Sequence, residues 1–296
     1  MMRLLLARGL VKSQPSYMTT RTENRSEPAS GRAWPMGRIA MRVFAGAGGA
    51  VAGLAAALLA MMPDPASAQV PASQSPAEIC LAANLRINLG APLPRTAARL
   101  RAGELLRIVA VGSSSTTGLW VLRRGATYPE VMGRELAVLR PAARVEMINS
   151  GRVGDTVGGT MARFGRDVIA YRPDLVVWQL GTNDVAWGGS ADGLKDQIVN
   201  GVRTLKTTGA DVILMDLQYA PAVLASSQYP LMQSAISEAA RQERVGLFSR
   251  FALMRRSIDA GLSPSALVSW DGLHNSADGY DCIGRALARA VDAGAR

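Results

Sequence analysis

Over residues 106–291, short apolar runs alternate with segments in which apolar residues recur at the spacing of a helix. Apolar runs that end in glycine or polar residues are typical of buried strands, and they cover residues 106–111, 144–149, 175–180, 211–217 and 245–248. Stretches with helical spacing follow, at 128–139, 160–171, 192–207, 231–244 and 276–291, the last with Ser276 suited to the N-cap. Strands that alternate with helices over short turns indicate a parallel sheet with helices on both faces. The pattern therefore predicts a three-layer α/β/α sandwich.

The amino-terminal part of the chain has a different pattern. Residues 43–62 form an uncharged run of small and apolar side chains, preceded by two arginines and followed by Ala66-Ser67-Ala68. A basic flank, an apolar run and an A-x-A site predict a secretory signal peptide cleaved after Ala68. The alternative is an uncleaved membrane anchor, since twenty residues can span a bilayer, and only then is membrane contact expected. Under both interpretations residues 69–296 lie outside the cytoplasm, so we expect a periplasmic or secreted protein.

We divide the chain into a leader (1–68), an amino-terminal extension (69–104) and a folded domain (105–296). The extension is rich in Ala, Pro and Ser, which predicts loop and one short helix. The only two cysteines, Cys80 and Cys282, both lie in the exported part, where an oxidising compartment allows them to pair. Such a bond closes a long loop and stabilises the fold by about 4–5 kcal/mol in the entropy model. The alternative is two separate buried thiols.

Charge and composition exclude several classes of function. Lysine and arginine total 33 against 23 acidic residues, a net charge of +10, but the arginines are scattered along predicted helices. Nucleic-acid binding needs basic side chains clustered on one element, so no nucleic-acid partner is expected. A single histidine and the absence of a C-x-x-C pair leave no spacing for a zinc site. The glycines after the second strand do not have the spacing of a dinucleotide loop. We therefore expect no metal and no cofactor.

Polar segments follow the strands at the edge where parallel sheets bind ligands. They are residues 112–116, 149–156 and 181–184, joined by 271–274 before the last helix. His274 is the only histidine, so it alone can serve as an imidazole base. Asp271 lies three residues earlier and can orient its ring. On its own a single histidine is equally well a surface or capping residue, but a serine-rich turn after the first strand supplies nucleophiles that need such a base.

These segments resemble the four consensus blocks of the SGNH (GDSL-like) hydrolase superfamily, in the same order and over residues 105–293. The first block, G-D-S-x-T-x-G, matches residues 112–118 and favours Ser114 as the nucleophile over Ser113 and Ser115. The second block contributes a glycine N–H and the third, G-x-N-D, an asparagine amide. The last, D-x-x-H, completes a catalytic triad. The resemblance implies Ser114, Asp271 and His274 as catalytic residues, and an oxyanion hole from Ser114, Gly154 and Asn183.

The resemblance also implies a parallel, flavodoxin-like sheet and a serine esterase that forms an acyl-enzyme. Short acyl groups, above all acetyl, on a carbohydrate or cell-wall polymer are the expected substrates. One departure is Ser113, where the family has aspartate, and it leaves open how the nucleophile turn is held. Trp120, Trp187 and Trp270 lie near the matched blocks and either line a cleft or pack, whereas Trp178 belongs to a strand. The alternatives are an acyltransferase at the same site, a non-catalytic glycan-binding module or an anchored structural protein.

Overall fold

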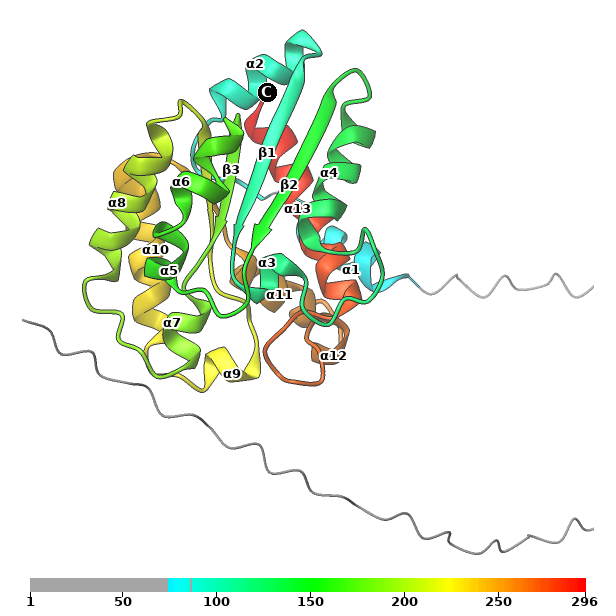
Figure 1. Ribbon diagram of the computed structural model, residues 1–296. Helices are drawn as coiled ribbons and strands as arrows, with labels where there is room; N and C mark the ends of the chain where they lie inside the picture. The colour runs from blue at the N-terminus through cyan, green and yellow to red at the C-terminus, as the bar shows by residue number, and fades with distance from the viewer. Residues whose placement is uncertain (1–73, 86) are drawn as a thin grey trace, which may run out of the picture. The chain divides into compact units, whose positions relative to one another are not determined.

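In the computed structural model, which describes residues 74–85 and 87–296, five parallel strands form one sheet (Figure 1). The strands are β1 (Leu105–Gly112), β2 (Arg144–Gly151), β3 (Leu175–Gln179), β4 (Asp211–Met215) and β5 (Gly246–Phe248). Their order is β2-β1-β3-β4-β5, the flavodoxin-like order that the resemblance implies. The proposed leader, with its apolar run at 43–62 and the cleavage site after Ala68, lies outside the described residues. Within them, no helix combines the length and hydropathy that a membrane span requires.

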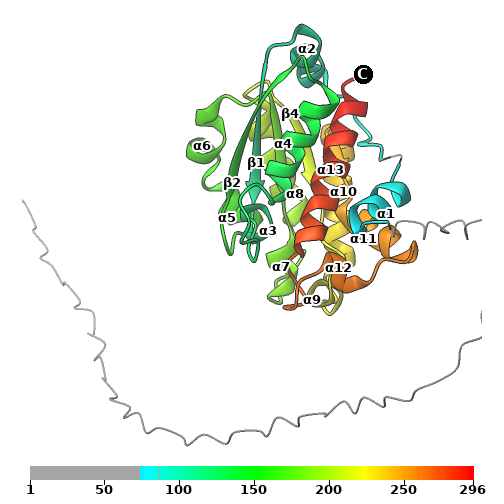
Figure 2. The ribbon, with the colours of Figure 1, turned by 90° about the vertical axis from the view of Figure 1, so that its right-hand side faces the viewer.

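Helices cover both faces of the sheet, which confirms the three-layer sandwich. The first face carries α1 (Pro76–Ala83), α2 (Pro94–Ala102), α4 (Tyr128–Leu139), α11 (Arg250–Asp259) and α13 (Ala277–Gly294). The second carries α5 (Val157–Met161), α6 (Phe164–Asp167), α8 (Leu194–Lys206) and α10 (Tyr229–Glu243). Successive strand side chains face opposite layers, so Ile108 and Ala110 enter the first core and Val109 and Val111 the second. Figure 2 shows α4 and α13 side by side over the first face.

The amino-terminal extension packs on this domain through two helices, where the sequence predicts one. Leu93, Ala97 and Leu100 of the α2 region are buried in the first core. The capping box of Ser75 and Glu78 starts α1. Cys80 of α1 forms a disulfide with Cys282 of α13, so the expected pairing is confirmed. The helix α11 was not expected; it begins at Ser249, whose side chain accepts a hydrogen bond from the backbone of Ala252.

The single helix predicted over 160–171 is wrong. The segment instead contains the end of α5, then α6, and then a 3₁₀ turn, η1 (Ile169–Tyr171). The break falls at Arg163, whose backbone leaves the helical region (φ −114°, ψ 7°) and whose side chain turns into the protein. Three glycines in the segment 157–167 weaken the helix further. Four short helices complete the fold: α3 (Ser114–Thr117), α7 (Thr182–Ala186), α9 (Pro221–Leu224) and α12 (Pro264–Leu267).

Candidate active site

Three side chains from the two ends of the domain are joined by hydrogen bonds. Ser114 Oγ lies 2.7 Å from His274 Nε2, and His274 Nδ1 lies 2.5 Å from Asp271 Oδ2. Ser114 begins α3 directly after β1, and the other two lie in the loop before α13. Figure 1 shows that α3 and this loop lie at the same end of the sheet, beyond the carboxyl ends of the strands. The structure thus brings together the serine, histidine and aspartate that the sequence singled out.

The turn that carries Ser114 is held by Gln179, a residue that the sequence analysis does not single out. Gln179, the last residue of β3, is buried, and its Oε1 accepts hydrogen bonds from the backbone N–H of Ser113 (2.9 Å), from Ser113 Oγ (2.9 Å) and from Thr116 Oγ1 (3.1 Å). The backbone and the hydroxyl of Ser113 are therefore both used to hold the turn. Ser115 Oγ is buried without a partner among the described residues. Of the three candidate serines, Ser114 is the one in contact with His274.

The loop that carries Asp271 fixes its carboxylate from several sides. Oδ1 accepts the backbone N–H groups of Leu273 and His274, both at 3.0 Å. Oδ2 accepts the indole N–H of Trp120 at 2.7 Å, besides its contact with the imidazole. Burial raises the pKa of Asp271, but the hydrogen bonds from His274, the two backbone groups and Trp120 outweigh it and lower the pKa to about 2. The carboxylate is therefore ionised at neutral pH and can stabilise an imidazolium.

Asn183 is hydrogen-bonded to the loop that carries Gly154. Asn183 in α7 is buried, and its Nδ2 donates to the backbone carbonyl of Asp155, the neighbour of Gly154 (2.8 Å). The loop is tied to β1 because Arg152 N donates to Gly112 O (2.9 Å). Gly154 has φ +82°, a region that favours glycine. The backbone N–H groups of Ser114 and Gly154 make no hydrogen bond to other described residues, so both can donate to a bound oxygen.

Arg163 holds this loop against the strand ends, a role that the sequence pattern does not indicate. Its guanidinium is buried and donates to the backbone carbonyls at the ends of β1 and β2, Gly112 O (3.0 Å) and Ser150 O (2.8 Å). It also forms ion pairs with Asp155 (2.5 Å) and Asp167 (3.1 Å). One side chain thus connects both strand ends to the loop of Gly154.

Three exposed tryptophans flank the triad. The rings of Trp120 and Trp270 lie beside Asp271 with their centroids 5.2 Å apart and their planes tilted by 55°, and the two residues are 48% and 81% exposed. Trp187, 64% exposed, lies on the other side, 3.6 Å from the position that a Cβ on Gly154 would take. Ser114 and His274 themselves are only 5% and 8% exposed. The reactive atoms are therefore recessed, whereas the side chains around them are wide, flat and apolar.

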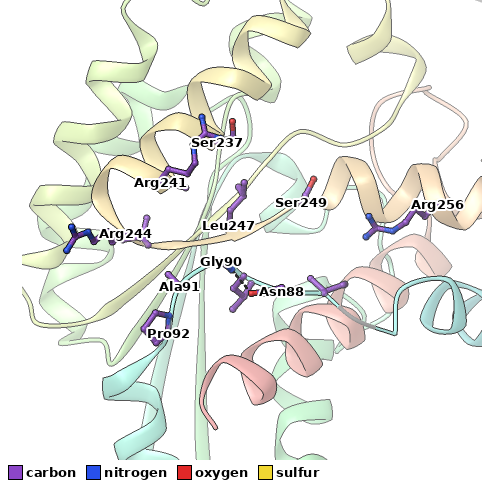
Figure 3. A pocket seen from close by; sticks show the side chains of 14 residues that line it. Asn88, Gly90, Ala91, Pro92, Ser237, Arg241, Arg244, Leu247, Ser249 and Arg256 are labelled. Carbon is purple, nitrogen blue, oxygen red and sulfur yellow. Dashed lines mark hydrogen bonds between the residues drawn. The ribbon is translucent and has the colours of Figure 1, made fainter.

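A cavity of about 570 Å³ opens elsewhere, at the edge of β5 (Figure 3). It is lined by residues 87–92 and by the exposed side chains of Arg241, Arg244 and Arg256, and contains no residue of the triad. Reaction chemistry is therefore better assigned to the Ser114 site than to this cavity. Within the described residues, no group of three or more His, Cys, Asp and Glu side chains is arranged to hold a metal.

Residues 79–296 match the non-GDSL lipase-like family over most of the chain. The chain belongs to this family. Among its relatives, the arylesterase of Vibrio mimicus is 31% identical over 85 residues, which are 29% of this chain and 42% of that protein. The match thus spans less than half of the arylesterase. The acetylxylan esterase of Geobacillus stearothermophilus is 25% identical over 179 residues, 56% of this chain and 81% of that protein.

Solved structures of other proteins have the same fold as this chain. A two-domain esterase active on acetylated mannans superposes with a TM-score of 0.60 at 22% identity, over 69% of this chain and 54% of that one. The Geobacillus acetylxylan esterase superposes with a TM-score of 0.52 at 23% identity, over 63% and 94%. Together with the family match, these similarities confirm the resemblance to the SGNH hydrolase superfamily and the α/β/α fold.

Proposed function

We propose that this protein is a serine esterase that hydrolyses carboxylic esters through an acyl-enzyme on Ser114. The observation that carries the proposal is the pair of contacts at 2.7 Å and 2.5 Å that joins Ser114, His274 and Asp271. Serine is a weak nucleophile until a base takes its proton, and the chain has one imidazole to do so. Relatives named as esterases support the same class of reaction.

In the proposed reaction, Ser114 Oγ attacks the ester carbonyl while His274 Nε2 takes its proton. This requires the tautomer with the proton on Nδ1, which donates to Asp271 Oδ2. The carbonyl oxygen becomes negative and receives the N–H groups of Ser114 and Gly154 and the amide of Asn183, each worth on the order of 3 kcal/mol. His274 then passes its proton to the leaving alkoxide. A water molecule, activated by the same ring, releases the acid and restores Ser114.

Alanine variants on p-nitrophenyl acetate test this proposal. We expect Ser114→Ala and His274→Ala to lower kcat at least about a thousandfold, because triad members act as a unit. Ser115→Ala is the matched control, since its hydroxyl has no partner in the described residues and should leave kcat within a factor of about two. A fluorophosphonate should label Ser114. Unchanged turnover in either triad variant would exclude the mechanism.

For the substrate, we propose short acyl esters, above all acetyl, on a carbohydrate polymer. The relatives named for acetylxylan and acetylated mannans support this class, and so do the exposed indoles of Trp187 and Trp270 on the two sides of the triad. Aromatic faces offer apolar contact to the flat faces of sugar rings. The Cys80–Cys282 disulfide supports a periplasmic or secreted location, where such polymers occur.

Acetylated xylan and p-nitrophenyl acetate, assayed in parallel, test the substrate proposal. We expect Trp187→Ala and Trp270→Ala to lower kcat/KM on the polymer by roughly fivefold each, the effect of about 1 kcal/mol of contact. Turnover of p-nitrophenyl acetate should change by less than about twofold. Equal losses on both substrates contradict polymer recognition by these rings. Recovery of acetate on an added sugar would identify an acyltransferase, and glycan binding without turnover a binding module.

A further inference from the structure

Trp120 combines two unusual features. Its backbone has φ +70°, a left-handed conformation that bulky residues rarely adopt. Its indole N–H donates to Asp271 Oδ2 at 2.7 Å, across 151 positions of sequence. Strained backbone persists only where surrounding contacts hold it, and such residues gather at functional sites.

The turn that carries Trp120 begins at the nucleophile helix. Gly118 N and Leu119 N both donate to Ser114 O, at 3.0 and 3.1 Å, and Val121 N donates to Gly118 O at 3.0 Å. The indole then reaches back to the loop of Asp271, where its ring contacts Trp270 at a tilt of 55°. Trp120 therefore connects the segment of the nucleophile with the segment of the acid.

The position of the indole N–H on the carboxylate determines what it can do. Oδ1 of Asp271 is already held by two backbone N–H groups, so the carboxylate does not need Trp120 to keep its orientation. The indole instead donates to Oδ2, the oxygen that also accepts the proton of His274 Nδ1. A second donor on this oxygen draws charge away from the imidazole and weakens its hold on the ring's proton.

We propose that Trp120 is a positioning residue of the triad, whose indole N–H shares Asp271 Oδ2 with His274 and keeps the imidazole from being held too tightly in its protonated form. This inference rests on the proposed serine esterase. Other ionisable groups near this pair are few. The phenol of Tyr280 in α13 interacts with Asp271, and the buried guanidinium of Arg250 in α11 acts on Tyr280 in turn. Both side chains are buried, and neither donates to Oδ2 in the described residues.

The chain offers a direct test because His274 is its only histidine. The full chain, purified without a polyhistidine tag, gives a single imidazole titration in NMR spectra. We expect the imidazole of Trp120→Phe to keep its proton up to a higher pH than the imidazole of the wild type, because the carboxylate keeps the charge that the indole shared. The matched variant Trp270→Phe keeps an aromatic ring beside Trp120 and leaves the indole N–H of Trp120 on Asp271 Oδ2, so it should leave the titration curve unchanged.

Kinetics give a second, independent readout. In Trp120→Phe, kcat/KM on p-nitrophenyl acetate should fall about three- to tenfold at acid pH and recover to within twofold at alkaline pH, because the acid limb follows the imidazole. Leu122→Ala, a fully exposed side chain of the same loop, should leave the profile unchanged. Trp120→Gly also removes the donor but accepts the positive φ, so it should move the titration in the same direction even if Trp120→Phe folds poorly.

A titration curve that stays in place or moves to lower pH in both Trp120 variants, or a loss of activity equal at all pH values, would overturn the assignment. The titration needs no turnover. If the wild-type chain hydrolyses no ester, the proposed function fails while the NMR result still decides the part of Trp120.

Discussion

Replacing Arg163 by methionine tests how the loop of Gly154 is held. The guanidinium is 7% exposed and binds two strand-end carbonyls and two carboxylates. Methionine fills much of the volume but leaves Asp155, whose side chain is 10% exposed, without its charged partner. Breaking a buried ion pair from one side costs about 3–5 kcal/mol. We expect the free energy of unfolding in urea at pH 7 to fall by that amount.

Arg166→Met is the matched control. Arg166 also pairs with Asp167, but its side chain is 75% exposed, so its loss should leave the free energy of unfolding nearly unchanged. Because Arg163 holds the loop beside the Gly154 N–H, the Arg163 variant should also lose kcat, on the order of tenfold to a hundredfold, in conditions where it is fully folded. Equal destabilisation by both variants, or a folded Arg163→Met with full kcat, would refute the reasoning.

Two further predictions concern stability. Reduction of the Cys80–Cys282 bond opens a loop between residues 202 positions apart and should lower the free energy of unfolding by about 5 kcal/mol in the entropy model. Urea unfolding curves with and without dithiothreitol measure this change. The variant with serine at both positions should not respond to the reductant. Burial raises the pKa of Asp216 to about 6, despite hydrogen bonds from Phe251 and Ser249 and the charge of Arg250. Asp216 therefore makes its full contribution to the free energy of unfolding below its unfolded pKa near 3.8. This contribution is lost as the pH rises through 6. The free energy of unfolding of Asp216→Asn, relative to that of the wild type, should therefore rise between pH 4.5 and pH 7.5. A difference between the two proteins that does not change with pH contradicts this.

The strands, and the three side chains that hydrogen bonds join at Ser114, Asp271 and His274, could be predicted because their signals are local. Each apolar run ends at or near a glycine or polar residue, and the predicted run 144–149 lies within the observed strand Arg144–Gly151. The pair Asp271 and His274 lies within four positions, and the chain contains no other histidine. The helix over 160–171 failed because apolar spacing does not reveal where a backbone must break to turn a charged side chain inward.

The residues that hold the site could not be read in this way, because their partners are distant in sequence. Arg163 contacts Gly112, 51 positions away, and Trp120 contacts Asp271, 151 positions away. In the sequence an arginine among helical residues looks like a surface charge, and a tryptophan looks like core or cleft. Gln179 is different: a polar residue inside the run LVVWQL, in a strand buried on both faces, needs a partner, and this signal could have found it.

The contacts of Gln179 also explain why the turn tolerates Ser113 where the family has aspartate. A carboxylate at 113 could only accept hydrogen bonds, and it would face an oxygen, Gln179 Oε1, that is an acceptor too. Serine supplies the donor that this oxygen needs, together with the backbone N–H of the same residue and the hydroxyl of Thr116. The turn is therefore held by a side chain from the neighbouring strand and adds no negative charge beside Ser114 and His274. Ser113 and Gln179 therefore hold the turn together in this chain.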